Sequence, residues 1–95
     1  NLMIKAFSKK GSFNCVLMIY RKMREESLSP DNYTYPFVLK AVGGLQAMAE
    51  AGEVHAHVVK SGFEFDAFAR SSLVGMYADM GRIEISRLLF DEMPE

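Results

Sequence analysis

Apolar residues along this chain gather in amphipathic clusters, and the clusters recur at a constant spacing. When the sequence is laid on itself at an offset of 35 residues, without gaps, apolar residues fall into shared columns. The clearest columns are Ile4, Leu39 and Val74; Phe7, Val42 and Tyr77; Ile19, Val54 and Leu89; and Tyr20, His55 and Phe90. A constant period of this length indicates a repeat array, in which each unit buries its apolar face against the next unit.

Within each period the apolar residues follow helical spacing, and no alternating strand pattern of useful length competes with it. The spacing predicts a first helix over Leu2–Lys9 and a second from Phe13 to about Glu26. Pro36 is acceptable only in the first turn of a helix, so it marks the start of the third helix. The pair Gly43-Gly44 is predicted to end that helix.

The remaining helices have comparable limits. The fourth is lined by apolar residues from Met48 to Val58, and Ser61-Gly62 is its predicted stop. The fifth begins at Asp66 or Ala67 and is broken by Gly81. The sixth has Pro94 at its end, and its inward residues are predicted to be Ile83, Ser86, Leu89, Phe90 and Met93.

The predicted fold is therefore all-α: a right-handed α-solenoid of three helix-turn-helix repeats, with six antiparallel helices. The repeats span residues 1–31, 32–66 and 67–95; the first lacks its opening residues and the third is truncated. One column, which we call the small column, holds only residues with small side chains: Val16, Ala51 and Ser86. It is predicted to mark a place where two helices approach closely.

Composition narrows the class of protein without naming a function. The 95 residues are 49% hydrophobic and 24% charged, which is typical of an ordered globular chain. The formal net charge of −1 provides no overall attraction to nucleic acid, so any RNA contact must depend on a local face. No apolar run approaches the length of a membrane span, and the lone Cys15 cannot form an internal disulfide.

Five segments of the chain resemble one known family. They are Leu28-Ser29-Pro30-Asp31, Tyr33–Ala41, Gly52–Phe63, Ser72–Gly81 and Leu89–Glu95. Together with the period, they resemble pentatricopeptide repeats of the plant P-L-S subtype, and the resemblance covers essentially the whole chain. Tetratricopeptide repeats are the nearest confusable class, but their period is 34 residues and their sequence pattern is absent here. By resemblance, the three repeats are P-type, L-type and S-type in that order.

The resemblance implies a protein of a mitochondrion or plastid that binds single-stranded RNA during editing or other processing. In this family, two side chains of each repeat contact one base. Carried over here, Asn1 with Asp31 forms the first pair and implies a preference for uracil. Pro36 with Asp66 forms the second, and it implies weak recognition because proline has no side-chain hydrogen-bonding group. In the third repeat, Ser71 implies a purine.

Two further columns follow from the resemblance. Tyr33 and Phe68 occupy the position that flanks the base, where an aromatic ring can stack on it or pack into the repeat junction instead. The column that meets phosphate in this family holds Lys9, Gly44 and Asp79, of which only Lys9 is suited to that role.

Each of these residues also has a purely structural interpretation. Asp31 and Asp66 stand where a helix N-cap is needed, and capping requires no RNA. His55 and His57 lie two residues apart on different sides of a helix, so they cannot share a metal, and His55 is expected to pack in the core. No zinc-deaminase pattern, phosphate loop or catalytic set is found, so we expect no cofactor, no metal, no small-molecule substrate and no enzyme activity.

The leading hypothesis is a non-enzymatic recognition module for single-stranded RNA, without a membrane partner, which positions RNA-editing accessory proteins or another domain on the transcript. The alternative is a protein–protein interaction scaffold in an organellar assembly, which the near-neutral charge and Pro36 favour.

Overall fold

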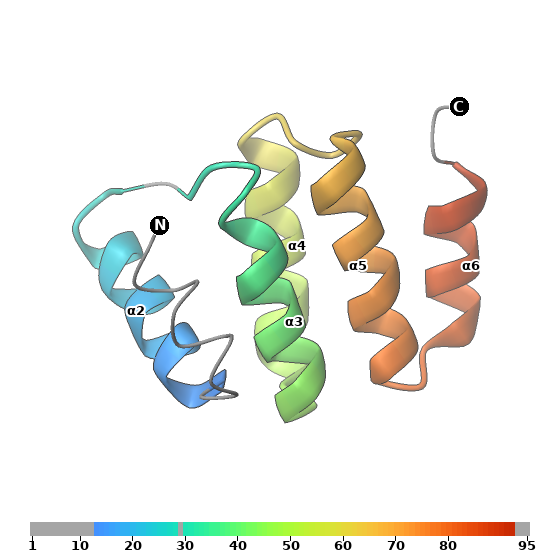
Figure 1. The fold of residues 1–95 in the computed structure, drawn as a ribbon, viewed down its shortest axis with the longest axis horizontal. Coiled ribbons are helices and arrows are strands. Elements are labelled where there is room, and N and C mark those ends of the chain that lie inside the picture. The colour runs from blue at the N-terminus through green and yellow to red at the C-terminus, as the bar shows by residue number, and fades with distance from the viewer. Residues whose placement is uncertain (1–12, 29, 93–95) are drawn as a thin grey trace.

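Five helices make up the described part of the chain. The computed structural model describes residues 13–28 and 30–92, and the predicted helix Leu2–Lys9 lies outside these ranges. The helices are α2 (Phe13–Glu25), α3 (Tyr35–Leu45), α4 (Met48–Lys60), α5 (Ala67–Asp79) and α6 (Ile83–Asp91) (Figure 1). No strand occurs within the described ranges, so the all-helical prediction is confirmed.

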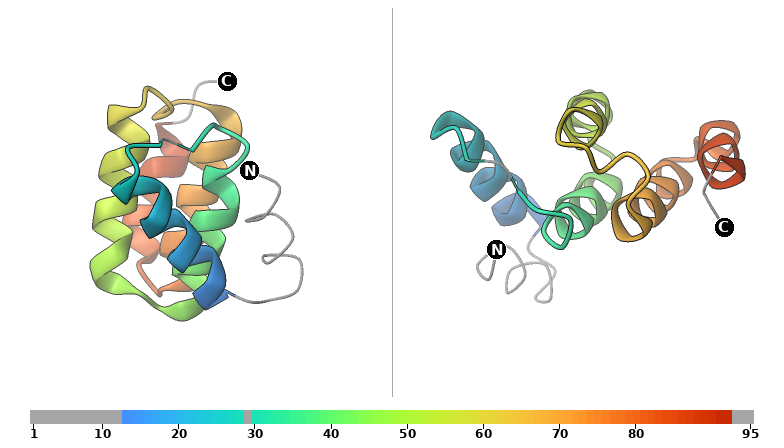
Figure 2. Two further views of the ribbon diagram at one scale, coloured as in Figure 1. Left: turned by 90° about the vertical axis from the view of Figure 1, so that its left-hand side faces the viewer. Right: turned by 90° about the horizontal axis from the view of Figure 1, so that it is seen from above.

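The helices form two layers. Seen from above, α3 and α5 lie side by side in one layer, and α2, α4 and α6 lie behind them in the other (Figure 2). α3 packs against α2, α4 and α5, and α5 packs against α4 and α6. Successive helices run antiparallel through short turns, which is the helix-turn-helix arrangement that the repeat period predicts (Figure 1). None of the described helices has the length and apolar character needed to cross a membrane.

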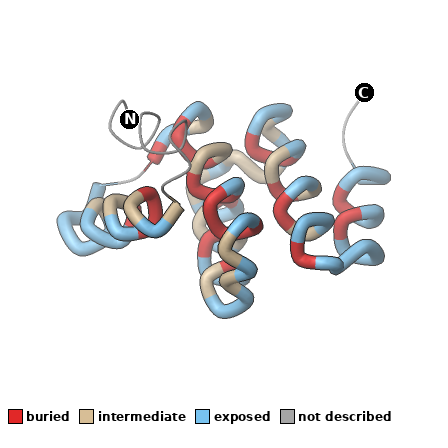
Figure 3. Tube along the Cα trace, turned by 60° about the horizontal axis from the view of Figure 1, so that its bottom comes forward, coloured by how far each residue is buried: buried red, intermediate tan, exposed pale blue. Residues whose placement is uncertain are grey.

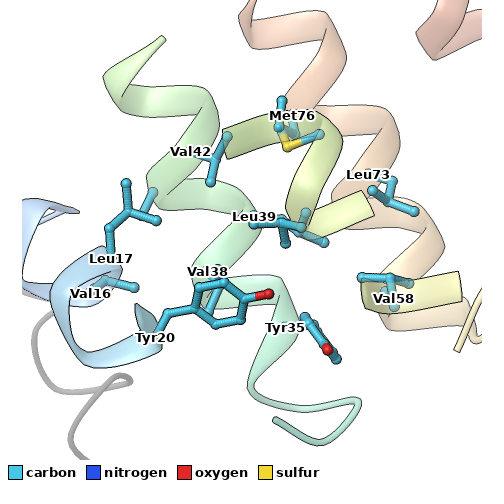
Figure 4. Close-up of a cluster of buried hydrophobic side chains, with 14 of the residues drawn as sticks. Val16, Leu17, Tyr20, Tyr35, Val38, Leu39, Val42, Val58, Leu73 and Met76 are labelled. Atoms are coloured by element: carbon cyan, nitrogen blue, oxygen red, sulfur yellow. The ribbon is translucent and has the colours of Figure 1, made fainter. Parts of the chain in front are cut away.

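The core is built around α3. Six of its 11 residues are buried, and Val38, Leu39 and Val42 are fully enclosed. Buried side chains of the neighbouring helices surround them, among them Val16, Leu17, Val58, Leu73 and Met76 (Figure 4). Buried positions follow the inner side of each helix, and exposed positions follow the outer side (Figure 3). Each fully buried aliphatic side chain contributes about 1.5–3 kcal/mol, so α3 is the main source of cohesion between the layers.

The prediction that Gly43-Gly44 ends the third helix is wrong. α3 continues through both glycines to Leu45, and Gln46 ends it with a left-handed backbone at φ 56°. The glycines instead allow close packing. A side chain at residue 43 would lie 3.2 Å from Met76 Cα, and one at residue 44 would overlap the ring of Phe13.

The small column is a site of close helix contact, as predicted. Val16, Ala51 and Ser86 are all buried. Ser86 Oγ donates a hydrogen bond of 2.8 Å to the Val74 carbonyl, which joins α6 to α5. The column therefore lies between the two helices of one repeat, at least in the third repeat.

Three residues predicted to face inward are largely exposed. Met48 is half-exposed at the start of α4, and Ile83 and Phe90 on α6 are 60% and 63% exposed. Within the described ranges α6 packs against α5 alone, so only Ser86 and Leu89 on that side are buried. Met93, also predicted to face inward, lies outside the described residues.

Candidate nucleic-acid interface

The two aspartates at the predicted base-reading positions accept hydrogen bonds from backbone N–H groups at the entries to α3 and α5. Asp31 Oδ1 accepts hydrogen bonds from the backbone N–H groups of Tyr33 and Thr34, at 3.1 and 2.8 Å. Asp66 Oδ2 accepts from the backbone N–H groups of Phe68 and Ala69, at 3.1 and 3.0 Å. Asp66 is therefore the N-cap of α5, whereas Asp31 binds backbone donors of the turn that precedes α3, whose N-cap residue is Thr34.

Asp31 is an exposed, ionised carboxylate. A side-chain hydrogen bond from Thr34 lowers the pKa of Asp31 below its usual value, and the backbone donors of Thr34 and Tyr33 lower it further. The group therefore carries its charge throughout the neutral pH range. An exposed carboxylate can accept hydrogen bonds from a base edge while its bonds to the turn remain intact.

Asp66 is more constrained, because Asn32 holds its second oxygen. Asn32 Nδ2 donates to Asp66 Oδ1 at 3.1 Å, while Oδ2 caps α5. Asn32 is the first residue of the predicted second repeat and Asp66 is the last, so the bond ties the two ends of one repeat together. Sequence reasoning missed Asn32, although the antiparallel return of each helix pair brings these ends close.

Tyr33 and Phe68 form an exposed aromatic pair. Their side chains are 65% and 57% exposed, and their ring centroids lie 5.7 Å apart at an interplanar angle of 41°. Neither ring enters the buried core. The two rings contact each other. The entry points of α3 and α5, where these residues lie, are at the same end of the two helices (Figure 1).

A shallow groove continues from these entry points between α3 and α5. Its volume is about 380 Å³, and its lining residues are Pro36, Phe37, Lys40, Ser72, Gly75, Met76 and Asp79. Pro36 is half-buried at its edge, and Ser71 is exposed beside the lining residue Ser72. Ser72 Oγ donates to the Phe68 carbonyl at 2.8 Å, so its hydroxyl is held within α5.

Lys40 is a cation that sequence reasoning overlooked. It is exposed and lines the groove four residues after Pro36, on the same face of α3. That spacing is the signal that could have identified it. Asp79, predicted to repel phosphate, lines the same groove, whereas Asn1 and Lys9 lie outside the described residues.

The two histidines of α4 contact different neighbours. His55 Nδ1 lies 2.9 Å from the Tyr77 hydroxyl of α5, and His57 Nδ1 lies 2.5 Å from the Tyr20 hydroxyl of α2. Burial lowers the pKa of both histidines and raises the pKa of Tyr20 to about 12. Both rings are partly buried and hydrogen-bonded to tyrosines, and the described residues contain no group of three or more side chains suited to a metal ion.

Comparisons with known proteins agree with the repeat spacing. A PPR repeat family model matches residues 1–44, and a PPR repeat model matches residues 68–95. A pentatricopeptide repeat-containing protein of Arabidopsis thaliana is 47% identical over 95 residues, which are 99% of this chain and 11% of the relative. A second Arabidopsis thaliana protein of this kind, named chloroplastic, is 38% identical over 99% of the chain and 11% of its own length.

A third relative, named chloroplastic/mitochondrial, is 43% identical over 82% of this chain and 12% of its own length, also from Arabidopsis thaliana. The chain thus spans about a tenth of the length of these relatives. Proteins of this kind are generally non-enzymatic RNA-binding factors. Taken together, the two matched segments, the relatives and the paired helices identify the chain as belonging to the pentatricopeptide repeat (PPR) family.

Proposed function

We propose that this chain recognises single-stranded RNA in a sequence-specific manner, with the RNA lying along the layer formed by α3 and α5. The observation that carries the proposal is the arrangement of Asp31 and Asp66. They occupy the same position one period apart, at the entries to α3 and α5, and each stands next to an exposed aromatic ring. RNA-binding repeats of this family use one base per repeat, so a regular row of acceptors and rings suits that ligand.

The proposed base contacts differ among the repeats. Asn1 with Asp31 prefers uracil, since an amide offers both a donor and an acceptor and Asp31 is exposed and ionised. Pro36 with Asp66 contributes little selectivity, and the bond from Asn32 to Asp66 supports this because it occupies one carboxylate oxygen. Ser71 selects a purine in the third repeat.

Stacking and phosphate contacts complete the proposed interface. Tyr33 and Phe68 are exposed and can offer aromatic faces worth about 1–3 kcal/mol per base. Because their centroids are 5.7 Å apart, a base placed between them requires the two rings to separate. Lys9 is the proposed phosphate contact of the first repeat, and Lys40 adds a second cation beside Pro36.

The wider setting is proposed from the family. The chain forms part of a right-handed solenoid in which Leu2–Lys9 is a further helix, and residues 1–31, 32–66 and 67–95 are P-, L- and S-type repeats. We place the protein in a mitochondrion or plastid, as a factor in RNA editing or processing that works with accessory proteins. Relatives named chloroplastic or chloroplastic/mitochondrial support that location.

The test compares single-stranded oligoribonucleotides that differ only at the base facing the first repeat. The full-length protein should favour uracil at that base, and Asn1→Ser with Asp31→Asn should move the preference toward adenine. The same pair of changes should leave selectivity at the neighbouring bases unchanged. Equal affinity for all four oligomers before and after the substitutions would falsify the base-reading proposal.

A protein-interaction scaffold is the second candidate. Three large apolar side chains of α6 support it, since Ile83, Leu88 and Phe90 are each at least 60% exposed. If the solenoid serves as a scaffold, substituting Leu88 and Phe90 with serine should abolish partner capture without changing RNA affinity. If it serves RNA recognition, the same changes should leave RNA selectivity intact, so the two functions can be separated.

A further inference from the structure

A second hollow in the molecule has a chemistry different from that of the groove between α3 and α5. A cavity of about 420 Å³ opens where the C-terminal ends of α2 and α4 meet the start of α3. Its polar lining consists of three basic residues and three hydroxyls: Arg24, His57, Lys60, Ser27, Tyr35 and Ser61. We call it the cationic cavity, because none of its lining residues is acidic.

The positive charge of the cationic cavity is not neutralised by an ion pair. Within the described ranges, the ion pairs are Arg21–Glu50 at 2.7 Å and Arg70–Glu92 at 2.9 Å, and neither includes Arg24 or Lys60. Basic residues in the last turn of a helix complement its dipole, which accounts for each cation singly. It does not account for the convergence of two cations, an imidazole and three hydroxyls on one cavity.

Ser27 adds a second, independent observation. Its backbone is left-handed, with φ 60°, and Gly62 occupies the same place one period later with φ 85°. Both turns carry the same hydrogen bond, from Leu28 N to Met23 O at 2.8 Å and from Phe63 N to Val58 O at 3.0 Å. Glycine adopts this conformation without strain, whereas serine does not.

The strain at Ser27 is not offset as it is elsewhere in the chain. Gln46 also has a positive φ, but its side chain donates to the Gly43 carbonyl at 3.0 Å and to the Asp79 carbonyl at 2.7 Å. The Ser27 hydroxyl makes no hydrogen bond within the described part of the chain, and it lines the cationic cavity. The left-handed backbone at Ser27, together with its hydroxyl facing the cavity, motivates the hypothesis of a ligand site.

One period later, two of the equivalent residues bond to each other. Residues 35 positions after Tyr35 and His57 are Arg70 and Glu92. Arg70 is buried there; its Nη2 donates to Glu92 Oε1 at 2.9 Å and its Nε donates to the Leu89 carbonyl at 3.1 Å. The second repeat junction thus neutralises its cation internally, whereas the first leaves its cations facing an open cavity.

We propose that the cationic cavity binds a dianionic phosphate group, either as free orthophosphate or as a phosphate monoester. Arg24 and Lys60 supply charged donors, and Ser27 supplies a neutral one. The hydroxyls of Tyr35 and Ser61 lie 3.2 Å apart, so one donates to the other and the second remains available to the phosphate. When the Tyr20 hydroxyl donates to His57 Nδ1, the hydrogen of the imidazole is on Nε2, which can donate to a phosphate oxygen. A tetrahedral anion with several acceptor oxygens matches this set of donors better than a planar carboxylate.

The test uses the full-length protein and orthophosphate, titrated by calorimetry at neutral pH and constant ionic strength set with sodium chloride. Lys60→Gln should weaken orthophosphate binding about tenfold, since it removes one charge-assisted hydrogen bond. Lys22→Gln is the matched control, because Lys22 is an exposed cation in the last turn of α2 that does not line the cavity. Ser27→Gly should weaken binding while raising the midpoint of thermal unfolding, which a merely destabilised variant cannot do.

Further arms distinguish the source of the phosphate. Tighter binding of O-phosphoserine than of orthophosphate supports a monoester, and equal binding supports the free ion, with serine as the negative control. Equal losses in Lys60→Gln and Lys22→Gln would overturn the proposal, because binding would then reflect general charge. Displacement of orthophosphate by an oligoribonucleotide without terminal phosphates would also overturn it, since the cavity would then hold a phosphodiester. Failure of RNA base selectivity leaves the orthophosphate test unaffected.

Discussion

The two repeat junctions of this chain share a backbone plan and differ in how they satisfy polar groups. In the first junction, where α3 packs against α2 and α4, Tyr35 is buried and its hydroxyl lies 3.2 Å from Ser61 Oγ. In the second, where α5 packs against α4 and α6, Arg70 takes the place of Tyr35 one period later. An aromatic residue with one hydroxyl and a cation with five donors thus fill the same site.

The partners change together with the buried residue. Tyr35 packs edge-on against Tyr20, with ring centroids 6.4 Å apart, and the first junction is held mainly by apolar and aromatic contacts (Figure 4). Arg70 instead bonds to Glu92 and the Leu89 carbonyl, and its guanidinium lies 5.0 Å from the centre of the Phe65 ring. The repeat period therefore conserves backbone geometry while each junction closes with its own chemistry.

The largest expected effect is the loss of Arg70. Arg70→Ala should lower the free energy of unfolding by about 3 kcal/mol, because it leaves a void and removes the donor of the buried Leu89 carbonyl. Glu92→Gln should cost less than about 1 kcal/mol, since the Glu92 side chain is 65% exposed and solvent screens its charge. Urea unfolding of the two variants measures both values.

The ordering of these two variants is the informative result. If Glu92→Gln proved as damaging as Arg70→Ala, the ion pair rather than the buried packing of Arg70 would hold the second junction. The converting double variant Arg70→Tyr with Glu92→His should recover part of the loss seen in Arg70→Ala, because it installs the residues of the first junction.

The next effect concerns the turn position shared by the two junctions. Ser27→Gly should stabilise the protein by about 0.5–1 kcal/mol and Gly62→Ser should destabilise it by about 1 kcal/mol, since both positions have a left-handed backbone. Gln46→Gly is the matched control. It should bring no gain, because the two side-chain hydrogen bonds of Gln46 are lost with the strain. A gain in Gln46→Gly equal to that in Ser27→Gly would contradict this account.

Much of the backbone could be predicted from the sequence, because the repeat period and the residues that begin and end helices are local signals. Pro36 lies in the first turn of α3 and Asp66 caps α5, as expected. Gly43-Gly44 misled the prediction, since a glycine pair indicates a helix stop or a close packing contact equally well from sequence alone. The contact with α5 that decides the matter joins residues more than 30 positions apart.

The sites were less accessible to sequence reasoning for the same reason. Nothing in the hydropathy pattern marks Arg70 for burial, because its burial depends on a carboxylate 22 residues away and a carbonyl on α6. Lys40 and Asn32 acquire their roles only when α3 lies beside α5. The cationic cavity likewise draws its lining from three helices, α2, α3 and α4, and from the turn after α2, so no single sequence motif marks it.

The smallest expected effect is a pH dependence that distinguishes the histidines of α4. Burial lowers the pKa of His57, and the positive charges of Arg24 on α2 and Lys60 on α4 lower it further, against the opposing charge of Glu53. The unfolded chain therefore binds a proton more readily than the folded one. Stability is complete above about pH 6.5 and falls as the pH decreases below that value.

His57→Gln should flatten this dependence below about pH 6.5, because glutamine can still accept the Tyr20 hydrogen bond but does not titrate. His55 contributes in the same direction, since burial and Arg70 lower its pKa, with Glu64 opposing, so His55→Gln should remove a separate part of the slope. The pKa of Asp31 is lowered on folding, so its contribution to stability is lost only as the pH falls below its usual pKa of 3.8. That range is separate from the range in which the histidines titrate. Urea unfolding at a series of pH values measures the three contributions, and an unchanged slope in the double histidine variant would show that neither imidazole is coupled to folding.

Saturating orthophosphate should reduce the part of the slope due to His57 and leave that of His55 intact, because only His57 lines the cationic cavity and a bound dianion favours its protonated form.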